Sequence, residues 1–321
     1  MENKILNKLK NSSEYLSGEI LSSDLNISRS AIWKHIKSLK NKGYIIDGKS
    51  NKGYKLIFCP DILSSQELMP LLKTNNLIKD IKHFYELSST NDTAKELARG
   101  EIDNGTLIVA EKQLSGKGRF DRQWVSPSSG IWFSLILKPN LPPIEASKIT
   151  QIAAASIYKT LLDFDIKVNI KWPNDIFLNE KKICGILTEM KCDMDRIHYL
   201  ILGVGINVNL ELADIPDELK GIATSLKIEL NKTFKRNDIL AKFLNHFEAL
   251  YNKFVLQKDI SEALSICREN SNIINKKAKL ITYNKEEIVT CLSLTDTGEL
   301  LVKDSDGKEK IITSGEISFR I

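Results

Sequence analysis

Cysteine, histidine and long apolar runs are scarce in this chain of 321 residues, which has five cysteines and four histidines. The cysteines are scattered and form no Cys-x-x-Cys pair, which argues against a disulfide framework or a zinc site and favours a reducing cytosol. No apolar run approaches the roughly 20 residues that a membrane-spanning helix needs. The N-terminus lacks the apolar core of a secretory signal. We therefore expect a cytoplasmic protein that has no membrane partner and no cluster of metal ligands.

The charge of the chain is unevenly distributed. Residues 1–60 hold eleven Lys and Arg against five Asp and Glu, a balance of +6. The whole chain has a net charge of +5, so the part from residue 61 to residue 321 is close to neutral. Because the basic excess is confined to one end, it predicts a polyanionic partner for the N-terminal part alone.

The basic N-terminal part has the pattern of a winged helix-turn-helix. A first helix is expected over 3–16 and a short helix within 17–27, followed by a third helix over 29–41 that Ser28 caps. A hairpin over 44–58 forms the wing. We expect the third helix in the major groove of DNA and the wing near phosphates, unless the motif makes only protein contacts. The candidate DNA-binding residues are Ser28, Arg29, Ser30, Trp33, Lys34, Lys37, Asn51 and Lys52.

The rest of the chain predicts an α+β protein with two further domains. Pro60 and the residues after it favour a linker, which places the first boundary near residue 62. In the central domain, 63–270, consecutive strands joined by tight turns predict an antiparallel or mixed sheet. The last domain, 271–321, shows short strands separated by Gly, Asp and Asn turns, the pattern of a small SH3-like β-barrel.

A basic, glycine-containing stretch between two strong strand signals, residues 113–124, is the clearest candidate for a ligand site. Gly116 and Gly118 would let the backbone take positive φ angles and approach a ligand closely. Its cations are Lys117, Arg119 and Arg122. Backbone N–H groups and cations together are how proteins hold phosphates and carboxylates. A flexible, solvated hairpin loop is the alternative interpretation.

Two further patterns accompany this stretch. The polar residues 88–91 precede a predicted helix over 92–98, where they could cap the helix or bond a polar ligand at its start. The predicted strand 199–208 is very apolar but contains Gly203 and Gly205, which indicates that a ligand or another backbone lies close to it.

Several of these stretches stand in a fixed order along the chain: Ser89-Thr-Asn91, Gln113-x-x-Gly-Lys-Gly-Arg119, Trp124-Val-Ser-Pro127, Lys171-Trp-Pro-Asn-Asp175, Lys182-x-x-Gly185-Ile-Leu, Gly203-x-Gly-Ile-Asn207 and Gly315-Glu-Ile-Ser-x-Arg320. In this order and spacing, the chain resembles the bifunctional biotin–protein ligase that doubles as the biotin-operon repressor. Each stretch alone is a weak signal. Together, with a winged helix in front and a small barrel behind, they extend the resemblance over the full length.

The resemblance implies a two-step reaction with biotin and ATP as substrates and Mg²⁺ accompanying the ATP. The first step gives biotinyl-5′-adenylate and pyrophosphate. In the second, a lysine on the biotin carboxyl carrier domain of acetyl-CoA carboxylase attacks the adenylate. It also implies that the adenylate promotes a homodimer whose winged helices bind operator DNA and repress the biotin biosynthesis genes.

The resemblance also assigns residues to roles. The implied catalytic residues are Lys182, Arg119 and Asp175. Those implied for biotin are Ser89, Thr90, Asn91, Gln113, Lys117, Gly118, Arg119, Lys182 and Gly185. Those implied for ATP or the adenylate are Lys117, Arg119, Trp124, Asn174, Asn207 and Arg320. The candidates for the apolar wall around the biotin tail are Leu187, Ile201, Val204 and Ile206.

The sequence departs from the family at the basic stretch. Lys117 stands where the family often has arginine, which keeps the charge but loses a bidentate fork. Phe120 and Asp121 stand where the family often has a basic residue and then glycine. Two other functions stay open. One is a lipoate or octanoate–protein ligase, which shares the catalytic architecture, and the other is a non-catalytic, ligand-sensing DNA-binding regulator.

Overall fold

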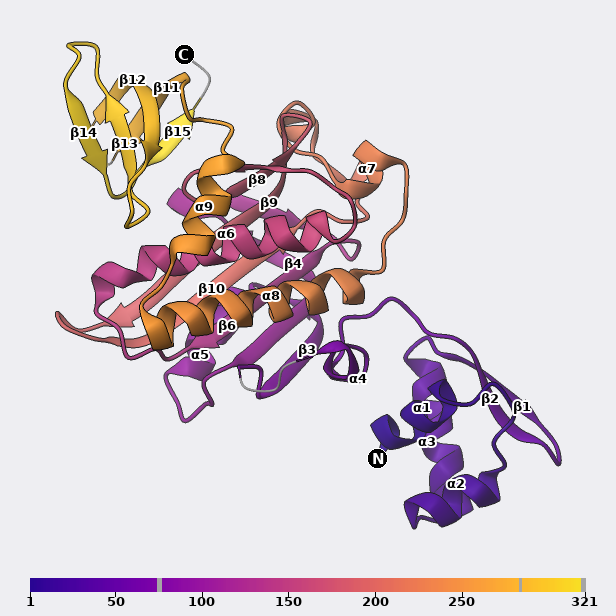
Figure 1. The fold of residues 1–321 in the computed structure, drawn as a ribbon. Coiled ribbons are helices and arrows are strands. Elements are labelled where there is room, and N and C mark those ends of the chain that lie inside the picture. The colour runs from indigo at the N-terminus through magenta and orange to yellow at the C-terminus, as the bar shows by residue number, and fades with distance from the viewer. Residues whose placement is uncertain (74–76, 283–284, 319–321) are drawn as a thin grey trace. The chain divides into compact units, whose positions relative to one another are not determined.

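The computed structural model describes residues 1–73, 77–282 and 285–318. The chain divides into two compact units, Met1–Ile62 and Leu63–Ile321 (Figure 1). Between the last strand of the first unit and the first helix of the second, residues 59–64 form neither helix nor strand. Pro60 lies within this segment and cannot donate to a β-ladder, which is why the strand before it ends there.

The first unit has the predicted order of two helices, a third capped helix and a hairpin. Its elements are α1 (Glu2–Lys10), α2 (Gly18–Leu25), α3 (Arg29–Asn41), β1 (Ile45–Lys49) and β2 (Gly53–Phe58). The Ser28 hydroxyl caps α3 by accepting a hydrogen bond from the Ala31 N–H at 3.2 Å, as predicted. Ile32, Ile36 and Leu39 of α3 are buried in the core of this unit.

The first helix is shorter than the predicted 3–16, because tertiary pairing takes over beyond Lys10. Leu16 forms an isolated β-bridge with Tyr54 of the wing, with N–H···O distances of 2.9 and 2.8 Å. At Gly53 the backbone has a φ of 103°, and a Cβ would lie 2.0 Å from the Leu16 carbonyl oxygen. Only glycine therefore allows the wing to approach the helical part this closely.

The second unit is built on an eight-stranded sheet. Seven of its strands have the order β3-β4-β6-β10-β9-β8-β7, and the eighth, β5, pairs with β4. β3 and β4 are parallel and the other pairs are antiparallel, which confirms the predicted mixed sheet. Its elements are α4 (Ser65–Leu68), β3 (Asp80–Leu87), α5 (Thr90–Ala98), β4 (Thr106–Lys117), β5 (Gln123–Ser126), β6 (Ile131–Leu137), α6 (Ala146–Leu162), β7 (Asn169–Lys171), β8 (Asp175–Leu178), β9 (Lys181–Cys192), β10 (Ile197–Ile206), α7 (Leu226–Leu230), α8 (Arg236–Gln257) and α9 (Ser261–Glu269).

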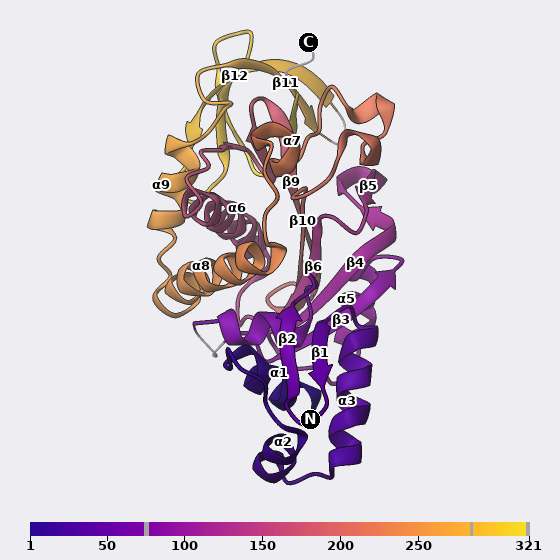
Figure 2. The same ribbon diagram turned by 90° about the vertical axis from the view of Figure 1, so that its right-hand side faces the viewer.

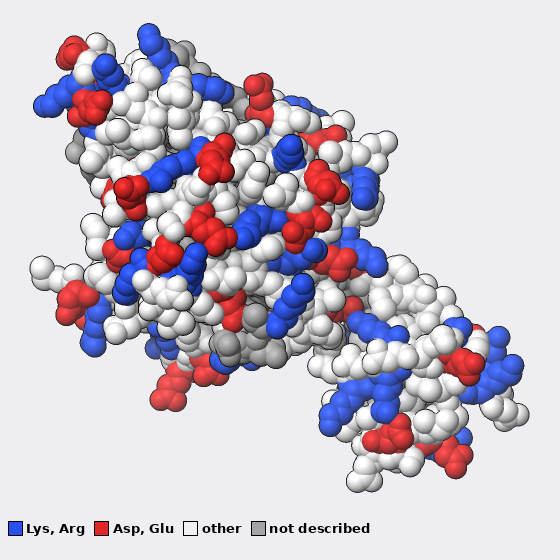
Figure 3. All heavy atoms as spheres, in the orientation of Figure 1, with Lys and Arg blue, Asp and Glu red and all other residues white. Residues whose placement is uncertain are grey.

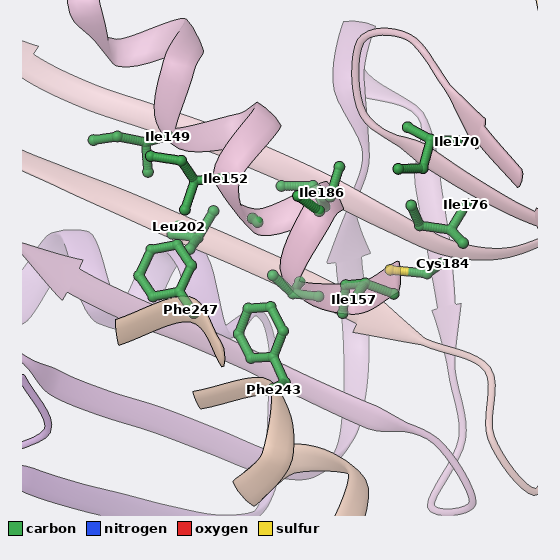
Figure 4. Close-up of a cluster of buried hydrophobic side chains, with 14 of the residues drawn as sticks. Ile149, Ile152, Ile157, Ile170, Ile176, Cys184, Ile186, Leu202, Phe243 and Phe247 are labelled. Atoms are coloured by element: carbon green, nitrogen blue, oxygen red, sulfur yellow. The ribbon is translucent and has the colours of Figure 1, made fainter. Parts of the chain in front are cut away.

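Helices cover both faces of this sheet, with α6, α8 and α9 on one side and α5 on the other (Figure 2). Successive side chains of β10 point to opposite faces of the sheet. Leu200 and Leu202 pack in the core with α6 and α8, whereas Ile201 packs with Ala94 and Ala98 of α5. Figure 4 shows Ile149 and Ile152 of α6 and the rings of Phe243 and Phe247 of α8 in the larger core.

Two stretches of this unit are less regular than their residue patterns predict. The pattern of residues 236–270 predicts helix throughout, but α8 ends at Gln257, its C-cap Lys258 has a left-handed φ of 58°, and α9 begins at Ser261. The alternating pattern of residues 166–171 predicts a strand, but only β7 is one. Ile166 and Val168, which precede β7, are buried in the core without being part of a ladder.

The C-terminal strands form an antiparallel sheet of five strands with the order β14-β13-β12-β11-β15. They are β11 (Lys277–Thr282), β12 (Lys285–Leu294), β13 (Leu300–Lys303), β14 (Glu309–Ile312) and β15 (Glu316–Ser318). Where the sequence predicts a small SH3-like barrel, the structure has an antiparallel β domain. The pattern of residues 279–283 predicts a strand whose end, Tyr283, lies outside the described residues, and no strand is expected where β15 lies. Leu280 and Val302 belong to the same hydrophobic cluster as α6 and α8. The division at 270/271 therefore stays a prediction.

Among the helices of the described ranges, none is both long and apolar enough to cross a membrane.

Candidate functional site

A cavity of about 640 Å³ opens in the second unit beside the start of α5, the β4–β5 hairpin and the β8–β9 turn. Twelve residues expected at a ligand site line it together. They are Ser89, Thr90, Asn91, Gln113, Lys117, Gly118, Arg119, Trp124, Asn174, Asp175, Lys182 and Gly185. They come from segments up to 96 positions apart in the sequence, and the sheet order brings them to one place.

The start of α5 both caps the helix and reaches the hairpin. Ser89 is the N-cap, and its hydroxyl accepts a hydrogen bond from the Asp92 N–H at 3.4 Å. Thr90 donates from its backbone N–H and its hydroxyl to Gln113 Oε1, at 2.8 and 3.0 Å. Gln113 Nε2 in turn donates to Ser126 Oγ at 2.9 Å. The capping interpretation therefore holds for Ser89, whereas Thr90 fixes the amide of Gln113.

Asn91 is held by the sheet beneath α5. Its Oδ1 accepts from Ser134 Oγ at 2.5 Å and its Nδ2 donates to Glu189 Oε2 at 2.7 Å. A Cβ on Gly203 would lie 2.1 Å from Asn91 Oδ1. The glycine in β10 was expected to admit a ligand or a backbone, and what it admits in this structure is the Asn91 side chain.

The basic stretch forms a hairpin in which β4 pairs with β5, with a short 3₁₀ turn, η2 (Arg119–Asp121), at its tip. The expected positive φ angles at Gly116 and Gly118 are wrong. Gly116 is required by close packing, because a Cβ there would lie 2.4 Å from the Trp124 carbonyl oxygen. The left-handed positions are instead Phe120 and Asp121, with φ values of 55° and 57°. Two non-glycine residues thus carry the backbone strain of the hairpin tip.

The cations of the hairpin have different partners. Lys117 Nζ lies 2.8 Å from the Asp92 carboxylate, and Arg122 Nη1 lies 2.8 Å from Glu316 Oε1 of β15. Arg119 donates from Nη1 to Asn174 Oδ1 at 3.3 Å. Burial lowers the pKa of the Arg119 guanidinium, and the charge of Asp175 opposes this effect. The hairpin is therefore joined to α5, to the β7–β8 turn and to the C-terminal sheet.

Lys182, Asp175 and Trp124 lie close together in the cavity lining. Lys182 Nζ lies 2.6 Å from Asp175 Oδ1 and 5.0 Å from the centre of the Trp124 ring. The ring lies against β9 and β10, where a Cβ on Gly185 or Gly205 would come within 2.9 or 2.7 Å of it. Among the described residues, the Trp124 Nε1 donor is buried without a hydrogen-bond partner. Because a side chain at Gly185 or Gly205 would collide with the ring, both glycines are needed for the Trp124 indole to lie here.

Several lining residues were not predicted. They include Gln123, Phe133, Lys171, Phe177, Glu180, Ile281, Glu316 and Ser318. Burial lowers the pKa of the Lys171 ammonium even though Asp175 lies nearby, and the ammonium is 5.5 Å from the centre of the Phe177 ring. Lys171, Glu316 and Ser318 belong to motifs on which the family resemblance rests. Their place in these motifs could have predicted that they line the site. The cavity holds more cationic than anionic side chains, which suits an anionic ligand.

Asn207 and Arg320 are not placed at the cavity. Asn207 is buried behind it, where its Nδ2 donates to the Thr224 carbonyl oxygen at 2.9 Å. Arg320 lies outside the described residues. Of the four apolar candidates, Leu187 and Val204 are lining residues, whereas Ile201 packs under α5 and Ile206 belongs to the larger core.

In the first unit, the predicted DNA-binding residues lie on the exposed side of α3 and at the tip of the wing. Those exposed are Ser28, Arg29, Ser30, Trp33, Lys34, Lys37, Asn51 and Lys52. Trp33 is 53% exposed, and the Lys37 ammonium lies 5.3 Å from the centre of its ring. Asn51 takes a φ of 65° at the wing turn. The buried residues of α3 face the opposite way, so its exposed side is available to a partner.

Comparison with known proteins agrees with this arrangement. Residues 83–207 match the biotin/lipoate A/B protein ligase family, residues 2–55 an HTH domain, and residues 281–320 the biotin protein ligase C terminal domain. The fold and the cavity therefore define a protein ligase of the biotin and lipoate class, preceded by a helix-turn-helix unit.

Relatives narrow this class. The bifunctional ligase/repressor BirA of Bacillus subtilis (strain 168) is 37% identical over 303 residues, covering 94% of this chain and 93% of that protein. The same protein of Escherichia coli (strain K12) is 28% identical over 309 residues, covering 96% and 94%. A structure of the biotin protein ligase from Aquifex aeolicus in complex with biotin and ATP covers 75% of this chain and 98% of its own, with a TM-score of 0.65 at 30% identity. The chain belongs to the family of bifunctional ligase/repressor proteins.

Proposed function

We propose that this chain activates biotin with ATP to biotinyl-5′-adenylate and transfers the biotinyl group to a lysine of the biotin carboxyl carrier domain of acetyl-CoA carboxylase. It is then a biotin–[acetyl-CoA-carboxylase] ligase. The observation that carries the proposal is the cavity itself, in which Lys182, Asp175 and Arg119 lie beside the polar start of α5 and the Trp124 ring.

The first step must bring two anions together, the biotin carboxylate and the α-phosphate of ATP. Lys182 and Arg119 offset the repulsion between them and stabilise the charge that develops on the phosphate. Holding both reactants in one cavity supplies the orientation that the bimolecular reaction lacks. Thr90 and Gln113 would bond the polar end of biotin, and the Trp124 ring would lie against the adenine. Pyrophosphate is the leaving group.

In the second step an uncharged lysine amine attacks the acyl carbon of the adenylate, and AMP leaves. The incoming ammonium must first lose a proton, and a nearby carboxylate can assist. Asp175 is the candidate because it lines the cavity beside Lys182.

Mg²⁺ would accompany ATP. In the described part of the chain, no group of three or more His, Cys, Asp or Glu side chains is placed to hold a metal ion. The metal would therefore be held mainly through phosphate oxygens. The cytoplasm is the compartment that we propose for this chemistry, in keeping with five cysteines that are all free.

The first unit would make the chain an adenylate-responsive repressor of biotin biosynthesis genes. The exposed cations of α3 and the wing suit operator DNA. The adenylate would promote a homodimer that carries two winged helices to two half-sites. When carrier domains are abundant, the adenylate is consumed and repression ends.

The experiment that tests the ligase measures pyrophosphate release from ATP and labelling of a carrier-domain lysine with biotin, lipoate or octanoate. We expect release and labelling with biotin alone. Release with lipoate or octanoate but not with biotin would make the chain a different acyl–protein ligase. Absence of release with all three acids would contradict catalysis and leave a ligand sensor.

A further inference from the structure

A cluster of buried charges lies outside the cavity, at the sheet end of the hairpin. Glu111 of β4 accepts on Oε1 from His83 of β3 at 2.7 Å, and its Oε2 lies 2.8 Å from Arg236 Nη2 of α8. The side chains of Glu111 and Arg236 are 8% and 5% exposed. Buried ion pairs are costly to desolvate and add little net stability, so their position in the fold matters more than their energy.

The carboxylate is held in its ionised form. Burial alone would raise the pKa of Glu111, but the hydrogen bond to His83 and the charge of Arg236 outweigh it, and the pKa lies below its ordinary value of 4.5. Glu111 is therefore a fixed anion at neutral pH and can keep all of its partners.

The cluster holds both ends of the hairpin. Glu111 precedes Gln113 by two positions on β4, and Gln113 bonds Thr90 in the cavity. Arg236 also donates from Nη1 to the carbonyl oxygen of Gly130 at 2.9 Å, between β5 and β6. A side chain has no space at this position, since a Cβ on Gly130 would lie 2.0 Å from the Trp132 ring. The β4–β5 hairpin therefore has one end near Glu111 and the other near Gly130, and we call these two ends its roots. The Glu111–Arg236 ion pair contacts both of them.

The same carboxylate holds the beginning of the second unit. The Leu63 N–H donates to Glu111 Oε1 at 2.8 Å. Leu63 directly follows the boundary of the first unit at Ile62, and its side chain is fully buried. The segment that arrives from the first unit is thus fixed to the oxygen that also binds His83.

We propose that Glu111 is a positioning residue that ties the linker at Leu63 to both roots of the ligand-site hairpin, so that ligand contacts made by the hairpin are transmitted to the DNA-binding unit. The proposal rests on the proposed function, because it concerns how the adenylate site affects DNA binding. A ligand that contacts Gln113 and Arg119 would hold the hairpin in one position. Glu111 would then hold the backbone of Leu63 in one position through its hydrogen bond to the Leu63 N–H. By linkage, DNA binding would tighten ligand binding by the same factor.

The test uses the full chain and a DNA fragment selected by the wild type in the presence of biotin and ATP. DNA affinity is measured with and without biotin and ATP, together with biotin-dependent pyrophosphate release. The variant is Glu111→Gln, which keeps the shape but loses the charge. The control is Glu248→Gln, because Glu248 is also buried and also accepts a backbone N–H, that of Leu77 at 3.1 Å.

For the wild type and the control we expect ligand to raise DNA affinity by about tenfold or more, within the usual range of allosteric coupling. Glu111→Gln should keep its ligand-free DNA affinity and its pyrophosphate release within about threefold, while the gain from ligand falls below about threefold. If thermal unfolding shows that Glu111→Gln does not fold, His83→Gln takes its place, and the same loss of gain is expected.

A variant that retains the wild-type gain would overturn the proposal while leaving the ligase and the repressor intact. A control that loses the gain equally would also overturn it, since any buried carboxylate would then have the same effect. A wild type that releases pyrophosphate but shows no gain would overturn the coupling and keep the ligase. A wild type that releases none would refute the proposed function itself.

Discussion

The two units of this chain use positive charge in different ways. On α3 of the first unit, Arg29, Lys34 and Lys37 are exposed, and the Lys37 ammonium lies over the Trp33 ring. In the cavity of the second unit, by contrast, Lys117 and Lys182 each lie within 2.8 Å of a carboxylate. Exposed cations can exchange counterions for DNA phosphates, and paired cations in a cavity are preorganised for a small anion.

The surface agrees with this division. On the face drawn in Figure 3, acidic and basic side chains are interspersed over the larger unit. The balance of +6 within residues 1–60 belongs to the winged helix. Residues 61–321 are close to neutral, although the lining of the cavity holds more cations than anions. Substitutions that remove a cation from the cavity should leave ligand-free DNA affinity unchanged, and those that remove a cation from α3 should leave pyrophosphate release unchanged. The following variants test this separation.

The largest effect is expected at Lys182, because its charge acts where the two anions react. Lys182→Ala should lower kcat/KM for biotin-dependent pyrophosphate release by about 100-fold or more, the usual cost of a lost electrostatic group. Ligand-free DNA affinity should not change. The control is Lys181→Ala, the neighbouring position, which does not line the cavity. Equal losses in both variants would contradict the role of Lys182.

A second variant tests the packing that forms the cavity. In Gly203→Ala the new Cβ would meet Asn91 Oδ1 at 2.1 Å, so Asn91 must move. We expect a loss of about 1–3 kcal/mol in the free energy of unfolding and a biotin affinity at least about tenfold lower. Calorimetric unfolding and biotin titration measure these. Gly100→Ala is the control, since Gly100 does not line the cavity and the nearest atom to its added Cβ, the Leu97 carbonyl oxygen, is 3.7 Å away. Unchanged biotin binding in Gly203→Ala would place the ligand elsewhere.

A third variant addresses the exposed cations. Lys34→Ala should weaken DNA binding and reduce the slope of log affinity against log salt by about 0.9 if this side chain meets one phosphate. Pyrophosphate release should stay at the wild-type rate. Lys4→Ala removes an exposed lysine from α1 of the same unit and serves as the control. The same salt slope in Lys34→Ala as in the wild type would remove α3 from the phosphate contacts.

The smallest effect is expected at Asp92, which is 39% exposed and joins Lys117 to α5. Burial would raise the pKa of Asp92, but Lys117 and Lys95 hold it below its ordinary value of 3.8. Its stabilisation is therefore complete above about pH 3.8 and is lost as the pH falls through the native pKa.

Asp92→Asn should accordingly cost less than about 1 kcal/mol in the free energy of unfolding at pH 7, as exposed ion pairs do. Urea unfolding at pH 7 and at pH 3 checks that the difference from the wild type shrinks at the lower pH. Asp195→Asn, at an exposed position, should show no difference at either pH. A difference for Asp92→Asn that grows on acidification would contradict the assigned ion pairs.

The sequence was most informative where local rules decide the structure. The Ser28 cap and the burial of Ile32, Ile36 and Leu39 follow from capping and periodicity, and the mixed sheet follows from strands joined by tight turns. Contacts and backbone angles that the pattern does not reveal decided the rest. The Leu16 bridge to the wing replaces the end of the predicted first helix, and a left-handed Lys258 ends α8.

For the site, the sequence motifs predicted which residues line the cavity, but not which side chains these residues bond. That Asn91 bonds Glu189, and that Glu316 of β15 reaches Arg122, depends on segments far apart in the chain. Gly116 was assigned a conformational role, whereas it is needed for space beside Trp124. The sequence alone cannot distinguish a glycine needed for a positive φ angle from a glycine needed for close packing, because both roles require the absence of a side chain.

The most direct test of this account is a crystal structure of the full chain grown with biotin, ATP and Mg²⁺. We predict biotinyl-5′-adenylate in the cavity, with its acyl phosphate beside Lys182 and Arg119 and its adenine against Trp124. An adenylate bound elsewhere, or a cavity that excludes it while the same chain releases pyrophosphate in solution, would contradict the assignment of this cavity as the active site.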